Sequence, residues 1–184
     1  TQSDGVGNAP WSQSAFAVFQ GAANDVLVSN EHGDVITSGM QFTTDGYVVT
    51  ADPAHSDSPL HLVATDLAGA VTPDNRYDAD GGAHADSYFL IRVGDGAAGA
   101  DITATMDVDL VQNSPADGAI RLLKTDPGRL ILNGDNQYGG GTAIWNGTLQ
   151  VSKDSSLGDD DTFVLIKNGA TFQTGADLTT SRLF

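Results

Sequence analysis

Aspartate supplies most of the reactive side chains in this sequence, since 23 of the 184 residues are aspartate and one is glutamate. Asp78, Asp80 and Asp86 fall within the stretch "DADGGAHAD" and offer the carboxylate oxygens that calcium binds. The stretch lacks the D-x-D-x-D-G order and the distal glutamate of a calcium hand. It also departs from a calcium-binding nonapeptide at His84 and has no second copy. We therefore expect a solvated acidic loop without a cofactor, with weak calcium binding by these aspartates as the alternative.

Catalytic arrangements are hard to find among the remaining polar residues. His55 and His61 lie near Asp57 in a serine-containing stretch, which is the residue set of a Ser-His-Asp hydrolase. The G-x-S-x-G turn that exposes such a serine in α/β-hydrolases is missing, and serine is common throughout the chain. Carboxylate pairs that cleave sugars are equally hard to assign, because the many aspartates make any chosen pair arbitrary. The sequence therefore predicts a protein that is not an enzyme.

The glycine pattern G-x-G-x-x-G at 94–99 follows a strand-like segment, "YFLIRV". In dinucleotide-binding proteins a helix follows this pattern and presents its N-terminus to the pyrophosphate. Here the next segment, 101–110, alternates between apolar and polar residues, which predicts a half-buried strand. We therefore interpret the glycines as a turn. The apolar face of the predicted strand consists of Ile102, Ala104, Met106, Val108 and Leu110.

Charge and composition restrict both the fold class and the partners. The net charge is −16, which disfavours binding to nucleic acid or to an anionic lipid surface, because both need a basic protein face. Aspartate and glycine favour turns over helices, so we expect an all-β protein with almost no helix. The sequence has no cysteine, which excludes disulfides and thiolate metal sites.

Short strand candidates begin at Phe16 and are separated by Gly, Asn or Asp. We interpret residues 1–15 as a polar lead-in or cap and residues 16–184 as one β-rich segment. Residues 52–86 form a looser loop region within that segment, with one strand candidate at Leu60–Ala64.

A repeat begins at Gly128, where the pattern G-x-L-x-L-x-x-D is followed 19 residues later by G-x-L-x-V-x-x-D at Gly147. A looser third copy begins at Gly169, 22 residues further on. A period of about 20 residues with short strands is typical of a solenoid, in which each coil covers the inward side chains of the next. The side chains expected to point inward and stack between coils are Leu130, Leu132, Leu149 and Val151.

The stretch "LLKTDPGRLILNGDNQYGGGTAIWNGTLQVSKDSSLG" resembles the autotransporter-associated β-strand repeat. That repeat reads approximately K-T-G-x-G-x-L-x-L-x-G-x-N-x-Y-x-G-G-T, followed by N-G-T-L-x-V and L-G, and Asp126-Pro127 departs from it. The resemblance implies a right-handed parallel β-helix with roughly 20 residues per coil. It also implies export through the periplasm and outer membrane by a C-terminal β-barrel translocator. The structural repeat positions that match are Gly128, Leu130, Leu132, Gly134, Asn136, Tyr138, Gly147, Leu149 and Val151.

We interpret the chain as a non-enzymatic passenger at the bacterial cell surface or secreted, acting in adhesion or cell–cell aggregation through the polar faces of its β-helix. Outward Thr, Asn and Asp side chains along a rigid rod would offer a repeated hydrogen-bonding surface without a pocket. The partners of the chain would be host or bacterial cell-surface molecules, or a second copy of the passenger. Two alternatives stay open: a passive β-helical stalk carrying a protease or esterase domain elsewhere in a longer chain, and a polysaccharide-active β-helix. Because acidic rods repel one another over about 10 Å at 0.1 M salt, we expect self-association to strengthen with salt or calcium.

Overall fold

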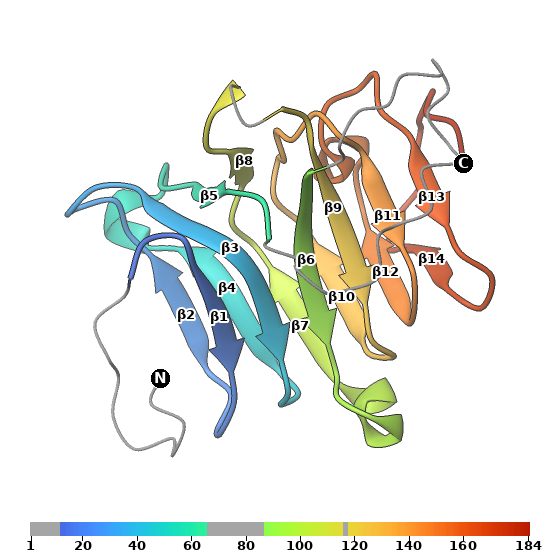
Figure 1. Ribbon diagram of the computed structural model, residues 1–184, viewed down its shortest axis with the longest axis horizontal. Helices are drawn as coiled ribbons and strands as arrows, with labels where there is room; N and C mark the ends of the chain where they lie inside the picture. The colour runs from blue at the N-terminus through green and yellow to red at the C-terminus, as the bar shows by residue number, and fades with distance from the viewer. Residues whose placement is uncertain (1–11, 66–86, 116–117) are drawn as a thin grey trace.

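The computed structural model describes residues 12–65, 87–115 and 118–184, which fold into parallel β-strands joined by turns (Figure 1). The predicted all-β class is confirmed, since these residues contain short 3-10 turns and no α-helix. Across the same ranges, no helical segment has the length and apolar character needed to span a membrane.

The described strands belong to two sheets. Sheet A has the order β13-β11-β9-β6-β3-β5-β8, with β1 also paired to β3. Its strands are β1 (Ala15–Phe19), β3 (Val35–Phe42), β5 (Leu60–Leu62), β6 (Ser87–Val93), β8 (Leu110–Gln112), β9 (Ile120–Thr125), β11 (Thr142–Ile144) and β13 (Val164–Ile166). Sheet B, in the order β14-β12-β10-β7-β4-β2, consists of β2 (Asp25–Val28), β4 (Tyr47–Ala51), β7 (Thr103–Met106), β10 (Arg129–Leu132), β12 (Thr148–Val151) and β14 (Thr171–Thr174). The 3-10 turns are η1 (Pro53–His55), η2 (Ala97–Asp101) and η4 (Asp154–Leu157).

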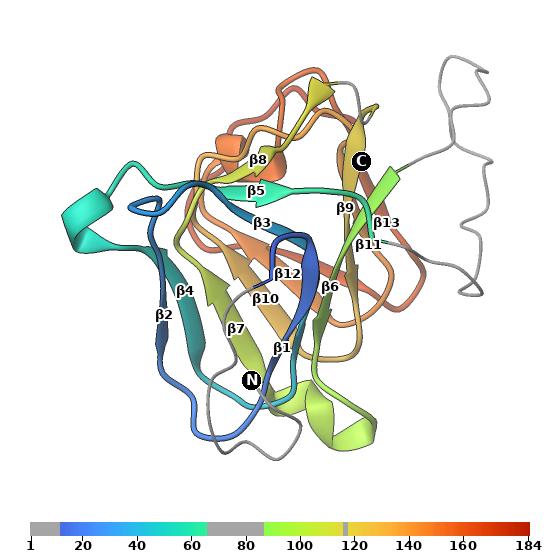
Figure 2. The same ribbon diagram turned by 60° about the vertical axis from the view of Figure 1, so that its left-hand side comes forward.

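The chain passes repeatedly from sheet A to sheet B and back, so both sheets grow by parallel pairing. Leu130 of β10, for example, lies between Ala104 of β7 and Leu149 of β12. Figure 2 shows the two curled sheets facing each other, with the sheet A strands β5 and β8 lying along a third side. The result is a solenoid-like stack, in which neighbouring coils cover one another's inward side chains.

In most strands, alternate residues fill the interior between the sheets. In β6, Phe89, Ile91 and Val93 are fully buried, and the neighbouring strands add further apolar side chains to the same cluster. At the N-terminal end the rings of Phe19 and Phe42 stack with their centroids 4.6 Å apart. Branched and aromatic side chains suit these positions because they pack well on a pleated surface.

The predicted continuous strand at 101–110 is wrong in one respect. The structure divides it into β7 and β8, with a corner at 107–109 where the chain leaves sheet B. Alternation along a sequence shows which side chains face inward. It continues through a corner between two sides of a solenoid, so it does not show where one strand ends and the next begins. The residues of the predicted apolar face that are buried on both sides of the corner are Ala104, Met106, Val108 and Leu110.

The other strand candidates all have counterparts. The candidate segments "AFAVF", "DVLVSN", "GDVITSGMQF" and "GYVVT" correspond to β1 to β4, whose bounds differ from them by up to two residues. The candidate at Leu60–Ala64 forms β5, which ends at Leu62. Residues 1–11 of the predicted lead-in and residues 66–86 of the loop region lie outside the described residues. The lead-in and loop boundaries therefore stay predictions.

Candidate functional site

The apolar pairs of the repeat lie inside the solenoid. Leu130 and Leu132 of β10 are fully buried. Leu149 and Val151 of β12 are buried as well, and they pair with Leu130 and Leu132 in that order. Burying a side chain of this size contributes about 1.5–3 kcal/mol to stability. These buried rows hold β10 and β12 in place, and the alternate residues of the same strands face the outside.

Gly128, Gly134 and Gly147 lie where neighbouring coils approach most closely. A side-chain carbon on Gly134 would clash with the carbonyl oxygen of Val108, and one on Gly147 would clash with that of Gly128. Gly147 also has a φ of 69°, a left-handed conformation that glycine adopts without strain. At Gly128 the same carbon would lie 2.5 Å from the carbonyl oxygen of Ile102. The repeat therefore needs glycine for backbone contact between coils.

Asn136 and Tyr138 close the third side of the solenoid from within. Oδ1 of Asn136 accepts a hydrogen bond from the Leu110 amide at 2.9 Å, and its Nδ2 donates to the Ser156 carbonyl at 2.6 Å. Asn136 thereby connects three successive coils. The Tyr138 hydroxyl lies 2.8 Å from Oγ1 of Thr142, and burial raises the pKa of Tyr138 well above its usual value. These buried side chains supply hydrogen bonds at a corner that has little strand pairing.

Lys124 is buried on the inward side of β9. Its Nζ donates to the carbonyls of Thr125 and Asp126, each at 2.7 Å, and to that of Asn146 at 3.1 Å. Burial, partly opposed by the charge of Asp126, lowers the pKa of Lys124 to about 8. The amine is thus occupied in holding the corner between sheets A and B, and it is not presented to a substrate.

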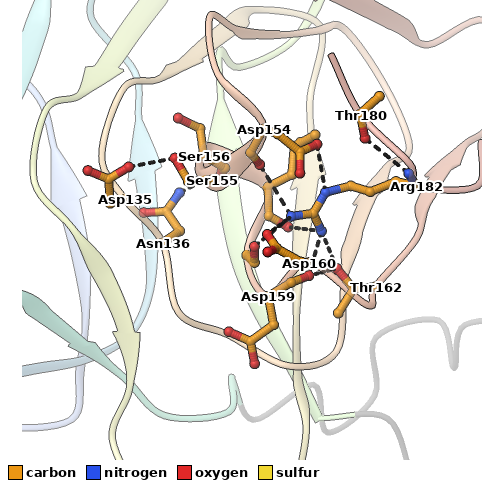
Figure 3. Close-up of polar contacts among 12 residues, drawn as sticks. Asp135, Asn136, Asp154, Ser155, Ser156, Asp159, Asp160, Thr162, Thr180 and Arg182 are labelled. Atoms are coloured by element: carbon orange, nitrogen blue, oxygen red, sulfur yellow. Dashed lines mark hydrogen bonds and ion pairs between the residues drawn. The ribbon is translucent and has the colours of Figure 1, made fainter. Parts of the chain in front are cut away.

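Arg182 holds the last described corner together (Figure 3). Its side chain is fully buried, with Nε 3.0 Å from the carboxylate of Asp154 and an Nη 3.6 Å from that of Asp160. It also donates to the carbonyl of Asp159 at 2.6 Å. The exposed acidic run 159–161 is therefore attached through its backbone and one carboxylate to a buried cation. This network positions the C-terminal coil.

Acidic side chains form a ladder along the outer corner that follows sheet B. Nδ2 of Asn133 donates to Asp107 at 2.6 Å, and the amide of Asp135 donates to the carboxylate of Asp109 at 2.7 Å. Nζ of Lys153 lies 2.7 Å from Asp135, and this hydrogen bond lowers the pKa of the Asp135 carboxyl. The carboxylates thus contact neighbouring coils and do not converge on one point.

Metal binding has no candidate within the part of the chain that the structure describes. No group of three or more His, Cys, Asp or Glu side chains there could hold a metal ion. Asp78, Asp80 and Asp86 lie outside the described residues, so calcium binding by them stays a prediction.

Among the histidines that the structure describes, His55 has the contacts nearest to a catalytic arrangement. Its Nδ1 lies 3.1 Å from Oγ of Ser29 and 3.3 Å from the carboxylate of Asp52. A catalytic triad uses a different ring nitrogen for each partner, whereas here both partners contact the same nitrogen. His61 contacts a different carboxylate, since its Nε2 lies 3.6 Å from Asp34. The structure therefore does not assemble a Ser-His-Asp relay at these residues.

The G-x-G-x-x-G pattern forms a turn, as predicted. A side-chain carbon on Gly94 would lie 2.5 Å from the carbonyl oxygen of Gly99, so these two glycines pack against each other. The five-residue turn η2 begins within the pattern at Ala97, and strand β7 follows where a nucleotide site requires a helix.

Outward side chains form rows along both sheets because the coils stack in register. One row on sheet B consists of Thr103, Arg129, Thr148 and Thr171. A row on sheet A, here called the outer row, consists of Gln41, Arg92, Thr125, Trp145 and Lys167. These rows are the surfaces that a partner can reach without entering the interior.

The sequence reasoning missed the outer row and the burial of Lys124 and Arg182. A signal existed for Lys124, because it continues the inward alternation of Ile120 and Leu122. No comparable signal existed for Arg182, whose partners lie 20 to 28 residues earlier in the chain. The outer row combines residues from five strands or strand ends, so its members are neighbours only after the coils have stacked.

Comparison with known proteins supports the resemblance carried by the repeat. Residues 122–151 match the family described as the passenger-associated-transport-repeat. The chain is also 42% identical over 176 residues to the adhesin BmaC autotransporter of Brucella suis biovar 1 (strain 1330), an alignment that covers 95% of the chain and 4% of that relative. No solved structure matches the chain. The chain is therefore a segment of an autotransporter passenger, and such passengers are exported through the outer membrane to the bacterial cell surface or secreted.

Proposed function

We propose that the chain is a non-enzymatic adhesive segment that contacts surface molecules through the outward rows of a β-helix. The observation that carries the proposal is its 42% identity to part of a protein named as an adhesin, over 95% of the chain. The chain spans about 4% of that relative's length, so the adhesive role is proposed here for the segment itself. Two observations support a non-enzymatic role. Ser29 and Asp52 contact the same ring nitrogen of His55, and the amine of Lys124 donates to backbone carbonyls.

The finer architecture that we propose is a right-handed parallel β-helix with coils of roughly 20 residues. Paired residues support this size: Leu130 and Leu149 are 19 apart, and Leu149 and Phe172 are 23 apart. Two spacings are longer: Ala104 and Leu130 are 26 apart, with β8 and β9 between them, and Tyr47 and Ala104 are 57 apart. Right-handed crossover is the strong general preference for parallel strands of one sheet, which supports the proposed hand.

A rod of this kind binds by repeating contacts along its length. Each outward row offers one side chain per coil at about 4.8 Å spacing, so a long partner can meet several weak contacts at once. The partners we propose are host or bacterial surface molecules, or a second copy of the passenger, with a translocator domain outside this chain. Self-association must overcome a net charge of −16 per copy, so it should strengthen as salt screens that charge.

The test is adhesion by bacteria that display the full passenger, compared with bacteria whose passenger lacks residues 12–184. A second control replaces this segment with an equal length of β-helix from elsewhere in the same passenger, which preserves rod length. Loss of adhesion in both variants supports the proposal. Adhesion restored by the length-matched replacement would identify the segment as a passive stalk and overturn it.

A further inference from the structure

We infer that the outer row of sheet A is a binding strip for an acidic polysaccharide. The inference rests on the proposed adhesive function and names the chemistry of one partner. The row contains Gln41, Arg92, Thr125, Trp145 and Lys167, and it runs across five neighbouring coils along the solenoid axis.

Strand register places these side chains beside one another. Gln41 pairs with Arg92, and Arg92 pairs with Thr125. Trp145 and Lys167 occupy the next two positions, because the Trp145 amide donates to the Lys124 carbonyl and the Lys167 amide donates to the Ile144 carbonyl. Each member therefore follows its neighbour at the inter-strand distance of about 4.8 Å.

The row lies on the outside of the molecule and is accessible. In β6 the buried residues Phe89, Ile91 and Val93 face the interior, so Arg92 faces outward, with 37% of its side chain exposed. Lys167 is exposed, and Trp145 is half-buried. A partner could thus contact charged, hydroxyl and aromatic groups without any change in the fold.

The outer row concentrates hydrogen-bond donors on a strongly acidic chain. The chain has eight lysines and arginines against 24 acidic residues, and Arg92 and Lys167 lie on the same strip. Arg92 forms an ion pair with Asp126 at 2.9 Å, but no ion pair in the described part of the chain involves Lys167. Lys167 is therefore available to a carboxylate or sulfate group, and Arg92 can bind one with the donors that Asp126 does not use.

The aromatic member favours a sugar over other anions. Nζ of Lys167 lies 4.5 Å from the centre of the Trp145 ring, so a cation and an aromatic surface occupy one place. An acidic sugar offers both an anion for the amine and an apolar C–H face for the ring. An acidic peptide offers the anion without that face.

The experiment measures binding of the chain to heparin as a sulfated glycan, polygalacturonate as a carboxylated glycan, neutral dextran and poly-glutamate. The variants are Lys167→Gln and Trp145→Leu, and the matched control is Arg129→Gln, which removes an exposed cation from the outward row of sheet B. We expect at least one acidic glycan to bind, dextran not to bind, and each outer-row variant to weaken binding about tenfold. The control should change it less than threefold, and sodium chloride should weaken binding.

Three results would overturn the inference: no binding to either acidic glycan, equal losses in the Arg129→Gln control, or equally tight binding of poly-glutamate, which would indicate attraction to any polyanion. Failure of the adhesive function is separable, because adhesion of displaying bacteria is measured on the same variants. Adhesion that persists in Lys167→Gln and Trp145→Leu would leave the proposed function standing without this strip. If the chain binds the glycan but its deletion leaves bacterial adhesion unchanged, the adhesive function is wrong and the binding strip stands.

Discussion

The interiors of the N-terminal and C-terminal coils are built differently. Between residues 12 and 51 the interior holds a cluster of aromatic rings, Phe19, Phe42 and Tyr47, and the buried polar side chain of this range is Thr37. After residue 120 the described interior contains buried polar side chains in addition to its apolar rows. They include Lys124, Asn136, Thr142, Ser156 and Arg182.

This difference shows how a short repeat can specify a coil. Burial of these apolar rings is non-directional, and the directed contact in the cluster is the Tyr47 hydroxyl, which donates to the carbonyl of Gln20 at 2.8 Å. A buried amide or ammonium must find partners in defined directions, and the corners of the C-terminal coils supply them. The repeat therefore specifies corners through buried polar contacts, in addition to strands through its apolar rows.

The largest expected change in the free energy of unfolding comes from disrupting the apolar rows that both regions share. Leu149→Asp places a charge without a partner among Leu130, Phe172 and their neighbours, and it should reduce the free energy of unfolding by several kcal/mol. Gln150→Asp, one residue along on the outward face, is the matched control. Thermal unfolding followed by circular dichroism measures both. A Leu149→Asp variant that melts within two degrees of the parent would show that the repeat does not face inward.

A smaller effect should separate the corners from the apolar rows. Asn136→Ala leaves the Leu110 amide and the Ser156 carbonyl without these partners, and each buried group left unpaired costs about 1–3 kcal/mol. Asn133→Ala, which removes an exposed hydrogen bond to Asp107, should cost less than about 1 kcal/mol. Urea unfolding compares the two. Equal losses would mean that the corner amide has no special role.

The sequence predicted the parts of the fold that depend on local pattern. Alternation at 101–110 and the repeat at Gly128 and Gly147 identified parallel, inward-facing strands, because side-chain direction repeats every two residues. The partners of Asn136 could not be predicted, because they lie 26 residues before it and 20 residues after it, and depend on how the coils stack. The outer row was beyond prediction for the same reason. Lys124 shows a different limit, since its charge argued for exposure while its position in the alternation indicated burial.

The smallest expected effect is a dependence on pH that belongs to the C-terminal coils. The pKa of Lys124 is lowered to about 8, because burial disfavours the ammonium, while a lysine in the unfolded chain titrates near 10.5. Between these values the unfolded chain binds more protons than the folded chain, so stability should rise with pH. The rise should be at most a few kcal/mol, since one pKa unit corresponds to about 1.4 kcal/mol.

Above about pH 10 the trend should reverse, because the pKa of Tyr138 is raised by burial and the unfolded tyrosine then loses its proton first. Urea unfolding from pH 7 to 10.5 should therefore show a maximum near pH 10. Lys124→Met should remove the rise, whereas Lys153→Met, which removes an outer cation paired with Asp135, should keep it. If stability still rises with pH in Lys124→Met, another group causes the rise. The buried Lys124 would then not be the source of a pH dependence specific to the C-terminal coils.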